Sequence, residues 1–334
     1  MKYKTVFLLS NTSSRSLRGP VQATAVRRCA GLELVSLITN GNISCTDLLE
    51  YISSQTDSVF VDVEKKQELG LGNHHDFAGN LYKRVLEATC QSDNPAVANL
   101  KIYPIKANDI TISALLEACF HDYKDVSGMT AAIIGIGNLG FKSALSLTES
   151  GVHVKAYNRT THKTFVATEA ITYFKPNATI SSPENCLNYL HAFVNSDFSV
   201  IASSNLSLPI EKISNIVKEN HTMYVFGHSI FSMESLNKLH AAGIRVVRID
   251  VSRALMQFVQ GKLSTTEFRT YGSTTKQGIT LCSGGFVGNV GTYIVDDYRD
   301  PQILLGECDG QCGMLTAKTN DLHLARIEDY DPPI

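Results

Sequence analysis

The chain has 334 residues, of which 43% are hydrophobic, and its formal net charge is −2. This length supports two ordinary domains, each with its own core. The near-neutral charge, without any basic block, argues against nucleic-acid and membrane-surface roles, and no apolar run approaches the roughly 18 residues that a membrane span requires.

Strands and helices alternate through the first half of the chain. We expect strands at residues 5–9, 58–63 and 101–105 and helices at 21–38, 45–53, 76–90 and from 110 onward. Short strands alternating with helices indicate a mostly parallel sheet with crossover connections. The fold class is therefore α/β, and residues 1–108 are predicted to form an α/β substrate or catalytic domain.

The second half contains five further strand patterns, and the segments between them are typical of helices. The strands read AAIIGI, VHVKAY, FSVIAS, TMYVF and IRVVRI. Five such units make one doubly wound parallel sheet, so residues 109–262 are predicted to form a Rossmann dinucleotide-binding domain. Residues 263–334 are expected to pack back on the cleft or on the first domain.

Acidic and cysteine residues of the C-terminal segment have two interpretations each. Asp296, Asp297 and Asp300 are suited to bind a cation or a substrate amine, but we favour turn residues and helix caps. Cys308 and Cys312 form the only close cysteine pair, without a second matching ligand pair, and no metal site is predicted. Eight cysteines at irregular spacing indicate reduced thiols in a cytoplasmic protein.

A glycine-rich turn follows the AAIIGI strand. Gly135, Gly137 and Gly140, with Asn138 and Leu139 between them, match G-x-G-x-x-G between a buried strand and a helix pattern. Such glycines permit a tight turn, a close approach of pyrophosphate to the backbone and close packing of the helix on the strand. We therefore predict that a dinucleotide phosphate rests on the N-terminus of this helix; a turn without a ligand is the alternative.

The end of the second Rossmann strand predicts which cofactor is used. An NAD site usually has an acid there, but this chain has Asn158 followed by Arg159 and Thr160, with Lys163 nearby. Asparagine does not repel a 2′-phosphate, and arginine can bind it bidentately. The sequence therefore predicts NADP, although a solvated helix start with Thr160 as N-cap accounts for the same residues.

With its NRT tripeptide after a G-x-G-x-x-G unit and a separate α/β domain before it, the chain resembles the shikimate/quinate dehydrogenase family. It also resembles the methylene-tetrahydromethanopterin dehydrogenases, which share the two-domain plan. The resemblance implies that Ser203 and Ser204, after the FSVIAS strand, lie beside the nicotinamide. It also implies that Asp109, one helix before the glycine-rich strand, is catalytic.

Two departures from the shikimate pattern change the expected substrate. Where those enzymes carry Asn-Val-Thr-x-Pro-x-Lys, this chain fits only at Val61 and Lys66, and their carboxylate-binding Ser-x-Ser has no clear counterpart. Shikimate is therefore not the expected substrate. The β-hydroxyacid dehydrogenases and pyrroline carboxylate reductases share the glycine and NRT motifs, but they usually open with them.

Hydride transfer requires a proton donor or acceptor close to the reacting carbon. Lys66 and Lys106 each follow a strand of the first domain, Asp109 starts a helix nearby, and His228 follows the TMYVF strand. We expect these four residues to be catalytic, with a lysine of lowered pKa exchanging the proton and Asp109 orienting it. The alternatives are a helix cap for Asp109 and a solvated turn for Lys66.

Together these patterns predict an NADP-dependent oxidoreductase. Its substrate is expected to be a small polar molecule, such as a hydroxy or keto acid, an imine or a pterin-type one-carbon carrier. A non-catalytic NADP(H) sensor is the rival hypothesis. We expect neither nucleic acid nor a membrane as partner, and a homodimer remains open.

Overall fold

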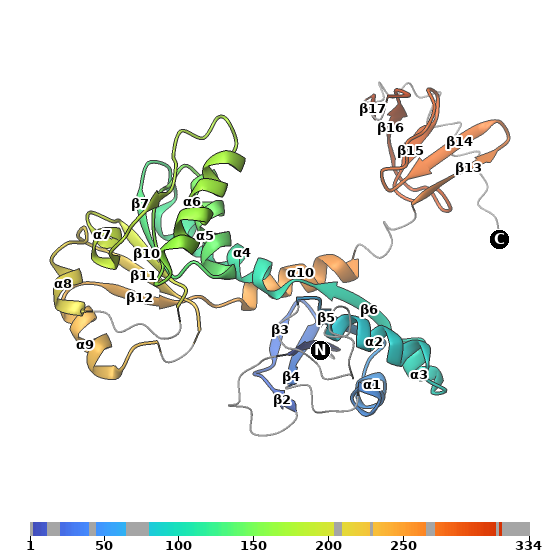
Figure 1. Ribbon diagram of the computed structural model, residues 1–334. Coiled ribbons are helices and arrows are strands. Elements are labelled where there is room, and N and C mark those ends of the chain that lie inside the picture. The colour runs from blue at the N-terminus through green and yellow to red at the C-terminus, as the bar shows by residue number, and fades with distance from the viewer. Residues whose placement is uncertain are drawn as a thin grey trace. The chain divides into compact units, whose positions relative to one another are not determined.

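A computed structural model describes residues 3–11, 21–39, 45–64, 80–203, 209–227, 230–264, 271–311 and 314–315. The chain divides into two compact units, residues 1–258 and 259–334 (Figure 1). The first unit contains two α/β sheets, and the second contains a small β-sheet. Two layered α/β sheets with parallel strands at their centres agree with the predicted fold class.

The first sheet is formed by the N-terminal strands. Its path is β2 (Val21–Ala23), β4 (Leu32–Thr39), β1 (Lys4–Asn11), β5 (Ser58–Asp62) and β6 (Lys101–Ile105), and β3 (Arg27–Cys29) also pairs with β4. β4, β1, β5 and β6 are parallel, whereas β2 and β3 run antiparallel to β4. The parallel strands therefore place their carboxyl ends along one edge of this sheet.

The helix expected at residues 21–38 was wrong, because this stretch forms β2, β3 and β4. Ala30 and Gly31 both have positive φ, 46° and 79°, and they turn β3 back onto β4. Gly31 is the residue that favours such a turn, since glycine adopts positive φ without steric cost. The strand conformation of β4 is held by pairing with β1 on one side and with β2 and β3 on the other.

Three helices cover one face of the first sheet. They are α1 (Cys45–Ser53), α2 (Leu81–Cys90) and α3 (Pro95–Ala98). Leu49, Val85 and Val97 from these helices pack against Phe7 and Val61 of the strands. The ring of Phe60 in β5 stacks on that of Tyr103 in β6, with 5.0 Å between the ring centroids. Each of these contacts removes apolar surface from water and fixes the sheet edge that follows β5 and β6.

The second sheet has the strand order of a dinucleotide-binding fold. Its order is β12-β11-β10-β7-β8-β9, formed by β7 (Thr130–Ile134), β8 (His153–Tyr157), β9 (Glu184–Asn185), β10 (Phe198–Ile201), β11 (Thr222–Val225) and β12 (Arg245–Arg248). All neighbouring pairs are parallel. Numbered from β7, this is the order 6-5-4-1-2-3 of a Rossmann fold.

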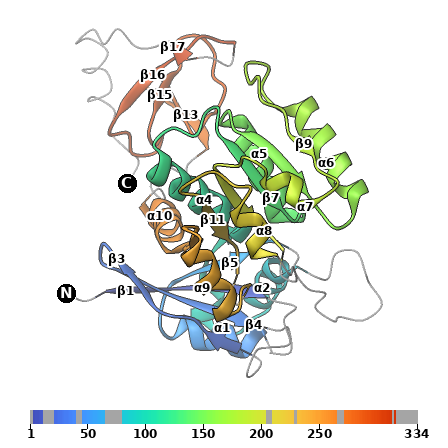
Figure 2. The same cartoon turned by 90° about the vertical axis from the view of Figure 1, so that its left-hand side faces the viewer.

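Helices lie on both faces of this sheet (Figures 1 and 2). Residues of α4 (Ala107–Tyr123), α5 (Asn138–Glu149) and α6 (Thr161–Phe174) share one core with β7, β8 and β10. Those of α7 (Tyr189–Phe193), α8 (Ile210–Ser214) and α9 (Met233–Ala241) share another core on the opposite face. The five predicted strands are all present, and β9 is an additional short edge strand. Helix α10 (Ser252–Ser264) follows β12 and contains the boundary between the two units.

The C-terminal unit contains β13 (Gly272–Lys276), β14 (Ile279–Ser283), β15 (Tyr293–Val295), β16 (Leu304–Cys308) and β17 (Met314–Leu315). Asp296 Oδ1 accepts hydrogen bonds from the backbone N–H groups of Gln302 and Ile303, both at 3.0 Å, which supports a turn role for this aspartate. Cys308 is buried with its sulfur 3.6 Å from that of Cys282. Cys312 lies outside the described residues.

Among the described helices, none has the length and apolar character that a membrane crossing would need.

Candidate functional site

The glycine-rich turn joins β7 to α5, and two of its glycines are required by packing. A Cβ atom at Gly135 would lie 2.9 Å from the carbonyl group of Ala202, and φ there is +99°. At Gly140 a Cβ would lie 1.8 Å from the carbonyl oxygen of Gly135. Only glycine therefore allows this close approach of β7, α5 and the end of β10.

Gly137 has a different environment from the other two glycines. A Cβ placed there would meet nothing within 4 Å. Gly137 is the N-cap of α5 and, as a glycine, has no side chain to cap that helix. The first N–H groups of a helix have no acceptor within the helix, and they attract anions. Open space beside an uncapped helix N-terminus is what a dinucleotide pyrophosphate needs, so the residues present fit such a cofactor.

Asn158 follows β8 and supports this turn. Its Oδ1 accepts a hydrogen bond from the N–H of Ile136 at 3.3 Å, and its Nδ2 donates to the carbonyl oxygen of Thr160 at 3.4 Å. The amide thus ties the second strand of the Rossmann unit to the glycine-rich turn. An aspartate could make the first bond but could not donate the second.

The expected phosphate-binding residues after Asn158 are exposed. Thr160 is the exposed N-cap residue of α6, as the alternative of a solvated helix start predicts, although its hydroxyl makes no cap bond. Arg159 and Lys163 are exposed, and within the described ranges no carboxylate pairs with either of them. Their positive charges therefore remain available beside the end of β8.

Four residues predicted to lie at the site have different outcomes. Ser203 follows β10 and is half-buried next to Gly135, whose hypothetical Cβ would be 3.0 Å from the Cβ of Ser203. Ser204, Lys66 and His228 lie outside the described residues, so their predicted roles stay predictions.

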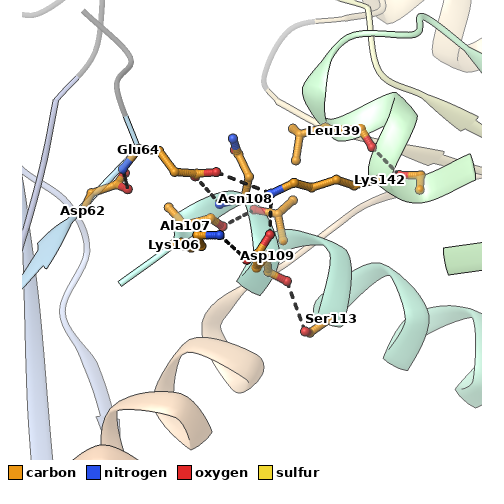
Figure 3. Close-up of polar contacts among 11 residues, drawn as sticks. Asp62, Glu64, Lys106, Ala107, Asn108, Asp109, Ser113, Leu139 and Lys142 are labelled. Carbon is orange, nitrogen blue, oxygen red and sulfur yellow. Dashed lines mark hydrogen bonds and ion pairs between the residues drawn. The ribbon is translucent and has the colours of Figure 1, made fainter. Parts of the chain in front are cut away.

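Asp109 and Lys106 are brought together with two residues that the sequence had not singled out as catalytic (Figure 3). Lys142 of α5 forms a short charged hydrogen bond with Asp109 at the start of α4. Its Nζ lies 3.5 Å from Oε1 of Glu64, two residues after β5. Lys106 Nζ lies 3.9 Å from Oδ2 of Asp109. We call Glu64, Asp109 and Lys142 the acid–lysine cluster.

Backbone contacts fix the carboxylates of the acid–lysine cluster. The N–H of Asn108 donates to Oε2 of Glu64 at 2.8 Å, and this bond joins the end of β5 to the first turn of α4. Asp109 lies in that first turn, where the helix dipole favours a negative charge. The side chains of Glu64 and Lys142 are 13% and 29% exposed, and that of Asp109 is 48% exposed. The cluster is therefore ordered but reachable from solvent.

The charge state of Lys142 follows from these neighbours. Partial burial lowers the pKa of Lys142, but the hydrogen bond and charge of Asp109, together with the charge of Glu64, outweigh it and raise that pKa. Lys142 is therefore an ammonium ion at neutral pH. The sequence predicts a catalytic lysine of lowered pKa, and Lys142 differs from that prediction because two carboxylates face it.

Polar side chains also occupy the carboxyl edge of the first sheet. Asp62, at the end of β5, is fully buried and accepts hydrogen bonds from Ser10 Oγ at 3.2 Å and from the N–H of Glu64 at 3.0 Å. Asn11, at the end of β1, is 2% exposed, and neither polar atom of its amide has a hydrogen-bond partner among the described residues. An unsatisfied buried amide is costly unless a ligand or water completes it.

Comparisons with known proteins identify no family for this chain. No family model matches the sequence, and no curated protein sequence matches it. Solved structures that resemble it include shikimate dehydrogenase from Aquifex aeolicus, with a TM-score of 0.45 and 12% identity over 76% of this chain and 91% of that one.

Two further solved structures show how wide this group is. L-tryptophan dehydrogenase from Nostoc punctiforme has a TM-score of 0.38 and 13% identity, covering 67% of this chain and 60% of that one, so this chain spans less than two thirds of that enzyme. Ornithine carbamoyltransferase from Pyrococcus furiosus has a TM-score of 0.39 and 10% identity over 78% and 85% of the two chains. Because these scores and identities are low, function has to be inferred from the residues of the chain itself.

Proposed function

We propose that this protein is an NADP-dependent oxidoreductase that transfers a hydride between nicotinamide and a small polar substrate. The observation that carries the proposal is the acid–lysine cluster, which lies one turn along the helix that begins at the glycine-rich turn. A solvent-accessible charge cluster beside a helix N-terminus would combine a cofactor site with a proton donor.

The proposed cofactor contacts come from two loops. The N–H groups at the start of α5 would hold the pyrophosphate, and Arg159, with Lys163, would hold the 2′-phosphate. Asn158 is committed to the turn through its bonds to Ile136 and Thr160, and it brings no negative charge that would repel the phosphate. The cofactor, when bound, supplies or accepts the hydride.

Lys142 would supply the proton in this reaction. When a carbonyl or imine carbon of the substrate gains the hydride, negative charge develops on its oxygen or nitrogen. The ammonium group of Lys142 stabilises this charge and donates a proton to the same atom, and solvent then returns a proton to Lys142. The raised pKa of Lys142 favours its protonated form, so near neutral pH this residue carries the proton that reduction of the substrate requires.

The substrate class follows from the polar edge of the first sheet. Asn11 offers both a donor and an acceptor that no residue in the described part of the chain binds, and Asp62 is a buried acceptor two residues before Glu64. Such groups favour a substrate that carries hydroxyl, carboxyl or amide groups over an apolar one. A hydroxy or keto acid and a polar imine both meet this requirement.

The test is a screen of small carbonyl and imine compounds with NADPH, followed by absorbance of the reduced cofactor. For any compound that is turned over, Lys142→Met should lower the turnover number at least about a hundredfold while NADPH affinity stays nearly unchanged. Lys218→Met is the matched control, because Lys218 also pairs with an aspartate, Asp197 at 2.9 Å, but lies outside the cluster. Equal losses in the two variants would contradict the role of Lys142.

The rival proposal is a sensor that binds NADP(H) without chemistry. Tight NADPH binding with no oxidation of NADPH by any compound in the screen would favour the sensor. In that case the proposed cofactor contacts would stand, and the proposed proton transfer by Lys142 would be rejected.

A further inference from the structure

A second group of potential ligands lies far along the chain from the acid–lysine cluster, at the edge of the Rossmann sheet. Glu184 is in the edge strand β9, Cys186 follows that strand, and His191 is in α7. One ligand atom from each of the three, a carboxylate oxygen, the sulfur and a ring nitrogen, lies within 4.8 Å of the other two. We call these three residues the Glu–Cys–His group.

We propose that the Glu–Cys–His group binds a divalent cation of the zinc type. Sulfur, imidazole nitrogen and carboxylate oxygen are the three ligand kinds that zinc takes in proteins. Three protein ligands leave one position of a tetrahedral site for water. This proposal is independent of the oxidoreductase function, and the sequence analysis had predicted no metal site.

The geometry is already close to that of a bound site. Nε2 of His191 lies 3.5 Å from Oε1 of Glu184. Two ligands at zinc bond lengths and a tetrahedral angle are separated by about 3.4 Å. A cation would therefore replace the direct ion pair of His191 and Glu184 with little movement of either side chain.

Local structure holds the ligand-bearing segment in place. The N–H of Cys186 donates to the carbonyl oxygen of Ala156 at 2.8 Å, which extends the pairing of β9 with β8. Asn188 caps α7, because its Oδ1 accepts from the N–H of Leu190 at 2.8 Å. The strand and the capped helix thus fix the two ends of a short loop, so that Cys186 and His191 are preorganised.

The charges of the site are balanced for a divalent cation, with one neighbour that opposes it. A thiolate from Cys186 and the carboxylate of Glu184 supply two negative charges, and neutral His191 supplies none. Lys155 pairs with Glu184 in the strand register and adds a positive charge nearby, although its Nζ donates to the carbonyl oxygen of Val194 at 3.1 Å. Lys155 should weaken cation binding without preventing it. A bound cation would be in direct contact with its three ligands, and the Coulomb energy between charges falls with their separation.

Cobalt absorbance tests the proposal on the full chain. The protein is treated with a chelator and titrated with Co²⁺, whose bond to a thiolate gives a near-ultraviolet charge-transfer band, and Zn²⁺ is then added as competitor. We expect one Co²⁺ per chain with a thiolate band that Zn²⁺ removes. Cys186→Ala should abolish the band. His191→Gln, an exposed substitution that should not affect folding, should weaken Co²⁺ binding at least about tenfold.

His121→Gln is the matched control, because His121 is also an exposed histidine that pairs with a carboxylate, Nδ1 to Oδ1 of Asp122 at 3.2 Å, and it lies outside the Glu–Cys–His group. This control should bind Co²⁺ like the unchanged chain. A band that survives Cys186→Ala, no band at all, or equal weakening by His191→Gln and His121→Gln would overturn the proposal. Circular dichroism of each variant establishes that the fold is retained, and His191→Gln decides the matter if Cys186→Ala does not fold.

Discussion

Helix α4 carries an aspartate near each of its ends, and the two have opposite environments. Asp109, in the first turn, is 48% exposed and pairs with Lys142 of the next helix. Asp122, in the last turn, is 15% exposed and accepts a hydrogen bond from the hydroxyl of Tyr224 at 2.6 Å and a second from Arg245. The helix dipole favours a negative charge at the first end and opposes it at the second.

We interpret Asp109 as part of the candidate site and Asp122 as a structural residue. Asp122 accepts hydrogen bonds from Tyr224 of β11 and Arg245 of β12, and so joins the helix to the sheet. Asp109 lies at the carboxyl edge of the strands, where parallel α/β sheets bind their ligands. A carboxylate–cation pair by itself therefore indicates no function; its position in the fold and its exposure decide the interpretation.

The largest expected effect is on turnover, at the N-terminal end of α4. Asp109→Asn removes the anion that holds Lys142 in place and keeps it protonated. We expect turnover to fall at least about a hundredfold, and the free energy of unfolding to change by less than about 1 kcal/mol, because an exposed pair contributes little. Steady-state kinetics and urea unfolding measure the two effects. If Asp109→Asn caused a large loss of stability and left turnover normal, Asp109 would have a structural role and not a catalytic one.

Asp122→Asn should give the converse result. It leaves Arg245 without its anion and weakens the bond from Tyr224, so unfolding should become easier by about 2 kcal/mol. Turnover of the folded protein should stay within about threefold of the unchanged chain, because Asp122 lies at the opposite end of a helix of 17 residues. Loss of turnover without loss of stability would contradict a structural role for Asp122.

The two ends should also respond at opposite extremes of pH. Burial raises the pKa of Asp122, but its hydrogen bonds from Tyr224, His121 and Arg245 outweigh this, and the pKa lies below the ordinary 3.8. Its contribution to stability is therefore present above pH 3.8 and is lost as the pH falls through the lower, folded-state pKa. The pKa of Lys142 is raised above 10.5, so its contribution is present below pH 10.5 and is lost as the pH rises through the folded value.

Unfolding curves across pH should show both changes. Asp122→Asn should remove the acid-dependent part, and Lys142→Met the alkaline part. Curves for the two variants that keep the same pH dependence as the unchanged chain would mean that neither pair contributes measurably.

The smallest effect is expected at Lys106, which the sequence had identified as a catalytic candidate. Its side chain is 63% exposed and 3.9 Å from Asp109, so its charge is largely screened. Lys106→Met should lower turnover by less than about tenfold, well below the effect of Lys142→Met. A loss as large as that of Lys142→Met would restore Lys106 as the proton donor.

Local patterns predicted most of the fold, since strands and turns depend on neighbouring residues. The glycines at 135, 137 and 140 and the strands around them are examples, because turn geometry and buried runs are local properties. The stretch from 21 to 38 failed because its apolar spacing suits a helix, whereas Ala30 and Gly31 form a turn and pairing with β1 imposes the strand.

The acid–lysine cluster could not be predicted in the same way. Asp109 and Lys142 are 33 positions apart in sequence, and Glu64 comes from a different sheet. Nothing in the sequence near Lys142 distinguishes it from other helix-surface lysines. Only the packing of α4 beside α5 brings the three charges together, and such contacts depend on the whole fold.

The proposal that the glycine-rich turn and Arg159 bind NADP is tested most directly by calorimetric titration of the full chain with NADPH and NADH in parallel. We predict one NADPH bound per chain, more tightly than NADH, and a loss of about 1–3 kcal/mol of NADPH binding in Arg159→Ala while NADH binding barely changes. Gly137→Val, which places a branched side chain in the open space at the start of α5, should abolish the binding of both in a folded protein. Absence of binding by either cofactor, or tighter binding of NADH, would contradict the account.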